Sequence, residues 1–247
     1  MQVGTQIGRY KLQNRIGGGL TSVVYRATET DSGREVALKL LARALAFSAY
    51  ARADLKRDIE RLAALNHPQI VPTLQTGMYR EQVYLIQPYF TAGSLAERMG
   101  GEWTFSDARQ LIEQLSAPLT AAHNADIVHG GLKPSNILFD SADTPHVSDF
   151  GLTQLTHANS GGWRGNALAQ TPYTAPEQQG GRPLDPRVDI YALGMLFAKL
   201  TGDDAAVERV TSVDPNQRPH TVRDLLTNLQ PTKRNLFSTI FKRVSTP

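Results

Sequence analysis

The hydrophobic periodicity of this 247-residue chain changes along its length, and this change restricts the fold more than any other feature. In EVALKLL, Val36, Leu38 and Leu40 alternate with other residues, which is the two-residue period of a strand. From Leu95 onward the spacing is mostly helical, as in SDARQLIEQLSAPLTAAHN, with Ser106 as the candidate cap, and in VDIYALGMLFAKLTG. The sequence therefore predicts an α+β fold, β-rich first and mostly helical afterwards.

One long helix is expected inside the β-rich part, over residues 44–65, with NHP as its stop signal. Asp58 lies on its apolar stripe, because at about 100° per residue it falls between Leu62 and Leu65. A carboxylate on a buried face requires a cationic partner. After this helix, EQVYLIQPYF is expected to form a buried strand, and the turn TAGSL is the expected junction between two lobes.

Composition excludes several classes of protein. The chain has 40% hydrophobic residues and no cysteine, so a globular fold without disulfides or thiolate ligands is expected. No stretch approaches the roughly 20 apolar residues of a membrane span, and the N-terminus lacks the layout of a signal peptide, so we expect a cytoplasmic protein. The net charge of +3 becomes −1 without the four basic residues of 231–247, so no nucleic-acid binding is expected.

The basic segment at 230–247 is treated as a separate tail. Its apolar residues lie within one helical arc and are flanked by basic ones, which is typical of amphipathic helices. They are Leu236, Phe237, Ile240, Phe241 and Val244. Two interpretations remain open: the tail docks on its own domain or is unstructured, or it makes a weak contact with an anionic membrane surface.

A glycine-rich hairpin precedes a series of short motifs in a fixed order. RIGGGLTSVVYRATE places Gly17, Gly18 and Gly19 between two strand-like runs, where the backbone can approach a polyphosphate closely. It is followed by VALK, HGGLKPSN, SDFG, APEQ, VDIYALG and DPNQRP. Over about residues 10–229 the motifs together resemble the protein kinase family, and their wording is most similar to bacterial serine/threonine kinases.

The resemblance implies a two-lobed protein-kinase-like fold. A small β-rich N-lobe would carry one long helix, and a larger C-lobe would be mostly helical. The kinase-like domain would cover residues 1–229, with the N-lobe at about 10–86, the hinge at 87–91 and the C-lobe at 92–229. The resemblance also implies ATP and Mg²⁺ as cofactors.

The same resemblance implies a set of site residues. Lys39 would hold the α- and β-phosphates of ATP, and Asp58 would position it, one methylene shorter than the usual glutamate. Asn136 and Asp149 would hold magnesium. The expected ATP-binding residues are Gly17, Gly19, Ser22, Val24, Ala37, Lys39 and Asp58, then Gln87, Pro88 and Phe90 at the hinge, and Leu138.

The departures from the family pattern concentrate on the transfer step. The usual His-Arg-Asp is HGG at 129–131, so Gly131 stands where an aspartate accepts the proton of the substrate hydroxyl. Lys133 of the same catalytic loop is retained. Gln170 replaces a threonine that braces the aspartate, unless a one-residue shift uses Thr171 instead.

Other matched positions have structural roles. Arg218 matches an arginine that pairs with Glu177, and Asp189 matches an aspartate that anchors the catalytic-loop backbone, so the C-lobe is expected to fold normally. Ser22 stands at the third glycine of the nucleotide-covering loop, where the backbone is thereby restricted. The segment 202–214 is short at the point where kinases usually place a further helix and loop for docking substrates.

Three functions are compatible with these features. The first is an ATP-binding, catalytically impaired pseudokinase that acts as a signalling switch or scaffold for an unidentified protein partner. The second is an active or weakly active protein serine/threonine kinase that transfers the γ-phosphate of ATP to protein hydroxyls. The third is a nucleotide-free interaction module. A positioned general base contributes about 10²- to 10⁴-fold in rate, so its loss at Gly131 favours the first.

Overall fold

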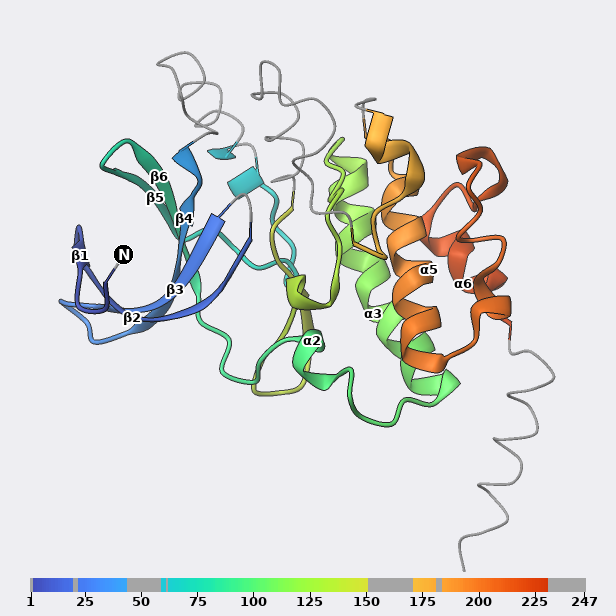
Figure 1. Ribbon diagram of the computed structural model, residues 1–247, viewed down its shortest axis with the longest axis horizontal. Helices are drawn as coiled ribbons and strands as arrows, with labels where there is room; N and C mark the ends of the chain where they lie inside the picture. The colour runs from blue at the N-terminus through green and yellow to red at the C-terminus, as the bar shows by residue number, and fades with distance from the viewer. Residues whose placement is uncertain are drawn as a thin grey trace, which may run out of the picture.

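An antiparallel sheet forms the first part of the chain, and a mostly helical body follows it (Figure 1). This computed structural model thus confirms the two-lobed α+β fold predicted from the change in periodicity. It describes residues 2–19, 22–43, 59–60, 62–150, 171–180 and 184–230. Outside the described residues lie Asp58, Gln170, most of the helix expected at 44–65, and the tail after Gln230.

The sheet of the N-lobe has six strands in the order β1-β2-β3-β4-β6-β5. The runs EVALKLL and EQVYLIQPYF form β4 and β6, as predicted. Between β5 and β6, Arg80 and Glu81 have φ values of 45° and 65°, as the two central residues of a type I′ hairpin turn require. The strands are β1 (Gln6–Ile7), β2 (Tyr10–Gly18), β3 (Ser22–Glu29), β4 (Glu35–Leu41), β5 (Gln75–Tyr79) and β6 (Gln82–Pro88).

Alternation along β4 separates the two faces of the sheet. Val36, Leu38 and Leu40 belong to a buried cluster with residues of β1, β2, β3 and β6. Ala37 and Lys39 therefore point to the opposite face, which is turned toward the cavity described below. The sequence prediction that Lys39 lies opposite the apolar residues of this strand is confirmed.

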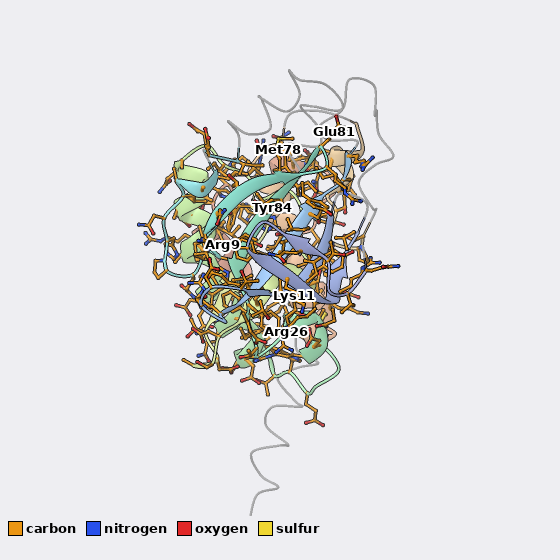
Figure 2. The ribbon with its side chains drawn as sticks, turned by 90° about the vertical axis from the view of Figure 1, so that its left-hand side faces the viewer. Arg9, Lys11, Arg26, Met78, Glu81 and Tyr84 are labelled. Carbon is orange, nitrogen blue, oxygen red and sulfur yellow. The ribbon has the colours of Figure 1, made fainter. Side chains whose placement is uncertain are left out.

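The outer end of the N-lobe is polar at its surface and aromatic inside. Figure 2 views this end, where Arg9, Lys11 and Glu81 are exposed and Tyr84 is buried. A Cβ atom on Gly77, the strand partner of Tyr84, would lie 2.3 Å from its ring. The absence of a side chain at Gly77 thus makes room for the tyrosine ring inside the N-lobe.

The C-lobe is built around two antiparallel-looking long helices, α3 and α5, which lie side by side in Figure 1 and share one hydrophobic core. Thr104 caps α3: its Oγ1 accepts from the Asp107 N–H at 3.1 Å, and the Asp107 carboxylate accepts from the Thr104 N–H at 3.0 Å. The prediction of Ser106 as the cap was wrong, because this reciprocal box begins two residues earlier. The helices are α2 (Leu95–Arg98), α3 (Phe105–Asn124), α5 (Arg187–Thr201) and α6 (Val222–Asn228).

Short elements connect these helices. The hairpin β7 (Ile137–Phe139) and β8 (Pro145–Val147) follows the 3₁₀ turn η2 (Pro134–Asn136). This order places the catalytic-loop motif immediately before β7 and the SDFG motif immediately after β8. The remaining 3₁₀ turns are η3 (Pro176–Gly180), η4 (Asp204–Val207) and η5 (Pro215–Gln217).

The short segment between α5 and η5 packs directly against α5. Val207 and Val210 of this segment are buried in the core of the C-lobe. A Cβ on Gly194 of α5 would lie only 2.7 Å from Cγ1 of Val210 and 2.9 Å from Cγ2 of Thr211. Gly194 therefore permits the close approach by which the shortened segment covers the helix.

We expect Gly194→Val to lower the free energy of unfolding by about 2 kcal/mol, because the added methyl groups overlap Val210 and Thr211. Urea unfolding of both proteins would measure this difference. Lys199→Val is the matched control, since it places the same residue at an exposed position of the same helix and is expected to cost less than about 1 kcal/mol. Equal losses in the two variants would contradict the close packing at Gly194.

Candidate functional site

A cavity of about 690 Å³ lies between the sheet and the C-lobe. It is lined from above by β2, β3, β4 and β6 and from below by the segments around η2, β7 and Asp149. Every residue expected from sequence to bind ATP lines this cavity except Asp58, which lies outside the described residues. Gly131, Lys133, Asn136 and Asp149 line it as well. Residues from distant parts of the chain are thus brought to one site.

An ion pair between Lys39 and Asp149 crosses the cavity from the sheet to the C-lobe. The Lys39 side chain is only 5% exposed, whereas that of Asp149 is 18% exposed. Asp149 has a φ of 68°, a left-handed conformation that aspartate tolerates better than most residues. Among the described residues Asp149 is therefore the partner of Lys39, and the expected pairing with Asp58 stays a prediction.

The Asp189 carboxylate anchors the loop that contains the HGG sequence. It is 1% exposed and accepts hydrogen bonds from the backbone N–H of His129 at 2.9 Å and of Gly130 at 2.8 Å. His123 Nε2 lies 2.8 Å from the same carboxylate. Gly130 has a φ of 67°, where glycine is unstrained, whereas Gly131 lies outside the positive-φ region. The anchoring role expected for Asp189 is observed.

Two amide side chains hold the loop from its other side. Asn136 Nδ2 donates to the Gly131 carbonyl at 2.9 Å, and Gln178 Nε2 donates to the Gly130 carbonyl at 2.7 Å. Gln178 Oε1 in turn accepts from the Ala175 N–H at 2.8 Å. Sequence reasoning gave Gln178 no role, although its position in APEQ, between motifs of the C-lobe, was a signal that a polar group was needed there.

His129 is completely buried in its neutral form. Its Nε2–H donates to the Ser148 carbonyl at 2.9 Å, and its Nδ1 accepts from the Gly131 N–H at 3.2 Å. Burial lowers the pKa of His129 below its ordinary value of 6.5. The ring also packs against Phe150 with the ring centres 4.9 Å apart, so the loop and the SDFG segment form one unit.

No described carboxylate stands at Gly131. The described cavity residues with carboxylates are Glu97 and Asp149. Glu97 accepts from Ser94 Oγ at 2.8 Å and from the Ser94 N–H at 3.3 Å, so it belongs to the cap of α2. Thr171 lines the cavity, as the one-residue shift requires, with its hydroxyl 3.1 Å from that of Thr174. The cavity keeps hydroxyl groups but lacks a base beside the loop.

The donor set fits a magnesium ion held mainly by a nucleotide. Asn136 and Asp149 offer side-chain oxygens, the ligands that Mg²⁺ prefers, and Mg²⁺ usually takes only one or two carboxylates with phosphates and water. Among the described residues, no group of three or more His, Asp or Glu side chains could hold a metal alone. The site therefore suits a metal that arrives with phosphate oxygens.

A buried ion pair joins two of the C-lobe motifs. Arg218 donates to both carboxylate oxygens of Glu177, at 2.6 and 2.8 Å, and to the Ser212 carbonyl at 2.8 Å. Its guanidinium also lies 4.9 Å from the ring centre of Tyr191 on α5. The pairing predicted for Arg218 and Glu177 is confirmed, and it fixes the segment after Thr171 against α5.

The fold and the cavity together define a protein-kinase-like molecule. Residues 10–239 match the family described as the protein kinase domain, so the chain belongs to this family. The chain is 32% identical to serine/threonine-protein kinase PknD of Mycobacterium tuberculosis over 90% of its own length and 35% of the relative's. It is 34% identical to PrkC of Bacillus subtilis, over 82% of this chain and 32% of that protein.

Other similarities agree with this assignment. The CBL-interacting serine/threonine-protein kinase 21 of Arabidopsis thaliana is 32% identical over 79% of this chain and 47% of that protein. The chain thus spans between a third and a half of the length of these relatives. The solved kinase domain of Mycobacterium tuberculosis PknI matches 93% of this chain and 97% of its own, with a TM-score of 0.73 and 20% identity, which supports the fold. Within the described residues, no helix has the length and apolarity of a membrane span.

Lys39→Met should lower the free energy of unfolding by about 2 kcal/mol in the absence of nucleotide, because Asp149 loses its cation while remaining largely buried. This value is below that for a fully buried pair, since Asp149 keeps some contact with water. Adding Asp149→Asn should recover part of the loss. Lys11→Met on the exposed outer surface is the matched control; a loss as large as that of Lys39→Met would contradict the ion pair.

The stability of the protein should fall as the pH drops below about 6.5. Because burial lowers the pKa of His129, the unfolded chain binds more protons there than the folded protein, so stability is present above this pH and lost below it. The slope per histidine is at most about 1.4 kcal/mol per pH unit. Lowered carboxyl pKa values such as that of Asp185 act near or below 3.8, in a separate window.

Urea unfolding at pH 7.5 and 5.5 measures this dependence, and His129→Gln should reduce it. His67→Gln is the control for the other histidine whose pKa is lowered by burial. An undiminished pH dependence in His129→Gln would show that the neutral, buried form of this ring is not its source.

Proposed function

We propose that this protein binds Mg·ATP in the cavity between the lobes and is a catalytically impaired kinase-like protein that acts as a signalling switch or scaffold. The single observation that carries this proposal is the combination within one cavity of Lys39, Asn136 and Asp149 with a glycine at position 131. Groups for holding phosphate and metal are present, and the group for activating an acceptor hydroxyl is absent. The protein partner is unidentified.

The proposed nucleotide pose uses groups from both lobes. Lys39 would bind phosphate oxygens, and Asn136 and Asp149 would offer oxygens to Mg²⁺, which neutralises the charge of the phosphates when bound. At the hinge, the Pro88 carbonyl and the Phe90 N–H would bind the edge of adenine. The Phe90 N–H makes no hydrogen bond in the part of the chain that the structure describes, so it is available to a ligand.

The energetic effect of the missing base sets the expected activity. A positioned general base contributes about 10²- to 10⁴-fold, which is roughly 3–5 kcal/mol of barrier. Protein kinases typically turn over at about 1–100 s⁻¹. The transition state of phosphoryl transfer is loose and depends mainly on positioning and metal ions. The proposal therefore predicts very slow transfer rather than a complete loss.

A weakly active serine/threonine kinase is the second candidate. It is supported by the retained Lys133 and by the hydroxyls of Thr171 and Thr174, which keep the acceptor side of the cavity polar. The kinase names of the relatives agree with it. In this case the acceptor hydroxyl would lose its proton to a phosphate oxygen of the nucleotide or to water.

Mg·ATP should raise the melting temperature of the protein. At a ligand concentration about 100 times Kd the stabilisation is about 2.7 kcal/mol, which for a chain of this size corresponds to about 5–10 °C. Lys39→Met and Asp149→Asn should each abolish the shift, whereas Lys11→Met should retain it. A shift that is the same with and without Mg²⁺ would contradict the metal site, and no shift at millimolar ATP would contradict nucleotide binding and favour an interaction module.

Gly131→Asp should increase transfer of the γ-phosphate to a generic protein substrate by about 10²-fold or more, because it returns a proton acceptor to the loop. Gly131 lies outside the positive-φ region, so an aspartate there requires no left-handed backbone. Transfer is measured with labelled ATP, and Gly131→Asn is the matched control that adds a similar side chain without a base. If wild type already equals Gly131→Asp, the second candidate is correct.

A further inference from the structure

The side chain of Gln87, at the end of β6, is a buried polar group without a partner. The residue is 8% exposed, and its amide makes no hydrogen bond with any part of the chain that the structure describes. The buried Gln178 differs, because both ends of its amide are bonded. A buried amide left unpaired costs free energy, so its presence requires an explanation.

The register of the sheet places this amide at the inner wall of the cavity. Gln87 lies directly opposite Ala37 on β4, and Leu85 lies opposite Lys39. Directly opposed residues of an antiparallel pair point to the same face. Gln87 therefore shares the face of Ala37 and Lys39, and it lines both the main cavity and a smaller cavity of about 30 Å³ behind it.

We propose that the Gln87 side chain recognises the N6 and N7 atoms of adenine and selects adenine nucleotides. This inference rests on the proposed function, because it assumes that the base lies against Pro88 and Phe90. When those backbone groups bind the edge of adenine that carries N1, the second hydrogen of N6 and the N7 atom remain unpaired. Gln87 is the next residue along β6, and it points into the same space.

The chemistry of the amide matches this pair of atoms. Oε1 accepts a hydrogen bond and Nε2 donates one, whereas adenine offers a donor at N6 and an acceptor at N7. Glutamine makes this two-bond contact with adenine in nucleic-acid recognition. Guanine offers acceptors at both O6 and N7, so Oε1 would face an oxygen and one bond would be lost. The same amide therefore favours adenine over guanine.

Water in the smaller cavity is the competing partner for the amide. A cavity of about 30 Å³ has room for one water molecule. Its wall is mostly apolar, which disfavours an ordered water with several partners; the apolar residues are Ile59, Leu62, Ile70, Val71, Leu85 and Phe150. The stability of the nucleotide-free protein separates the two cases.

The first experiment compares ATP with 7-deaza-ATP, in which a C–H group replaces N7, by calorimetry with Mg²⁺. Wild type should bind ATP about 3–10-fold more tightly, the difference of one hydrogen bond, and Gln87→Met should bind the two nucleotides equally. Gln69→Met is the matched control, because the Gln69 amide is bonded to the Pro145 carbonyl at 3.2 Å, outside the cavity; it should retain the wild-type ratio.

The second measurement is the melting temperature without nucleotide. Gln87→Met removes an unpaired amide and should leave this temperature unchanged or raise it by a few degrees, whereas Gln69→Met should lower it. A lower temperature for Gln87→Met would show that the amide is already bonded to water and would overturn the inference. Equal binding of ATP and 7-deaza-ATP by wild type would overturn it too, while the proposed function stands. Binding of neither nucleotide would overturn both.

Discussion

The buried carboxylate of Asp189 is the interaction on which the arrangement of the site depends. A charge with 1% exposure must be satisfied by hydrogen bonds, and Asp189 obtains them from two successive backbone N–H groups, of His129 and Gly130, and from His123. These bonds fix the loop to the start of α5. The loop then positions Asn136, and through the His129 ring it positions the segment that carries Asp149.

The cavity combines two functions that kinases normally couple. Its N-lobe wall and its metal side hold charged and polar groups suited to a nucleotide, whereas its acceptor side holds glycine and hydroxyl groups. Binding a nucleotide and processing it therefore depend on different residues of this chain. A ligand that contacts Lys39 on the sheet and Asp149 below it would tie the two lobes together, and such differential contact is the requirement for a ligand-driven switch.

Much of the fold and most of the site residues could be predicted because they depend on periodicity and on ordered motifs. The strand pattern located β4 and β6, and the motif order led to residues that line one cavity. The cap at Thr104 and the role of Gln178 could not be predicted, because they depend on local dihedral angles and on contacts between distant segments. The pairing of Lys39 with Asp149 likewise depends on how the lobes close, which no local pattern encodes.

The loop at 129–131 is held from outside by Asp189, Gln178 and Asn136, and none of these bonds uses a side chain at position 130 or 131. Natural selection for a folded chain is therefore almost blind to the loss of chemistry at these two positions. The reverse path is harder at one of them, since any side chain at Gly130, with its φ of 67°, costs about 1 kcal/mol. The loop behaves as an evolutionary ratchet, which passes easily from catalysis to binding and returns with difficulty.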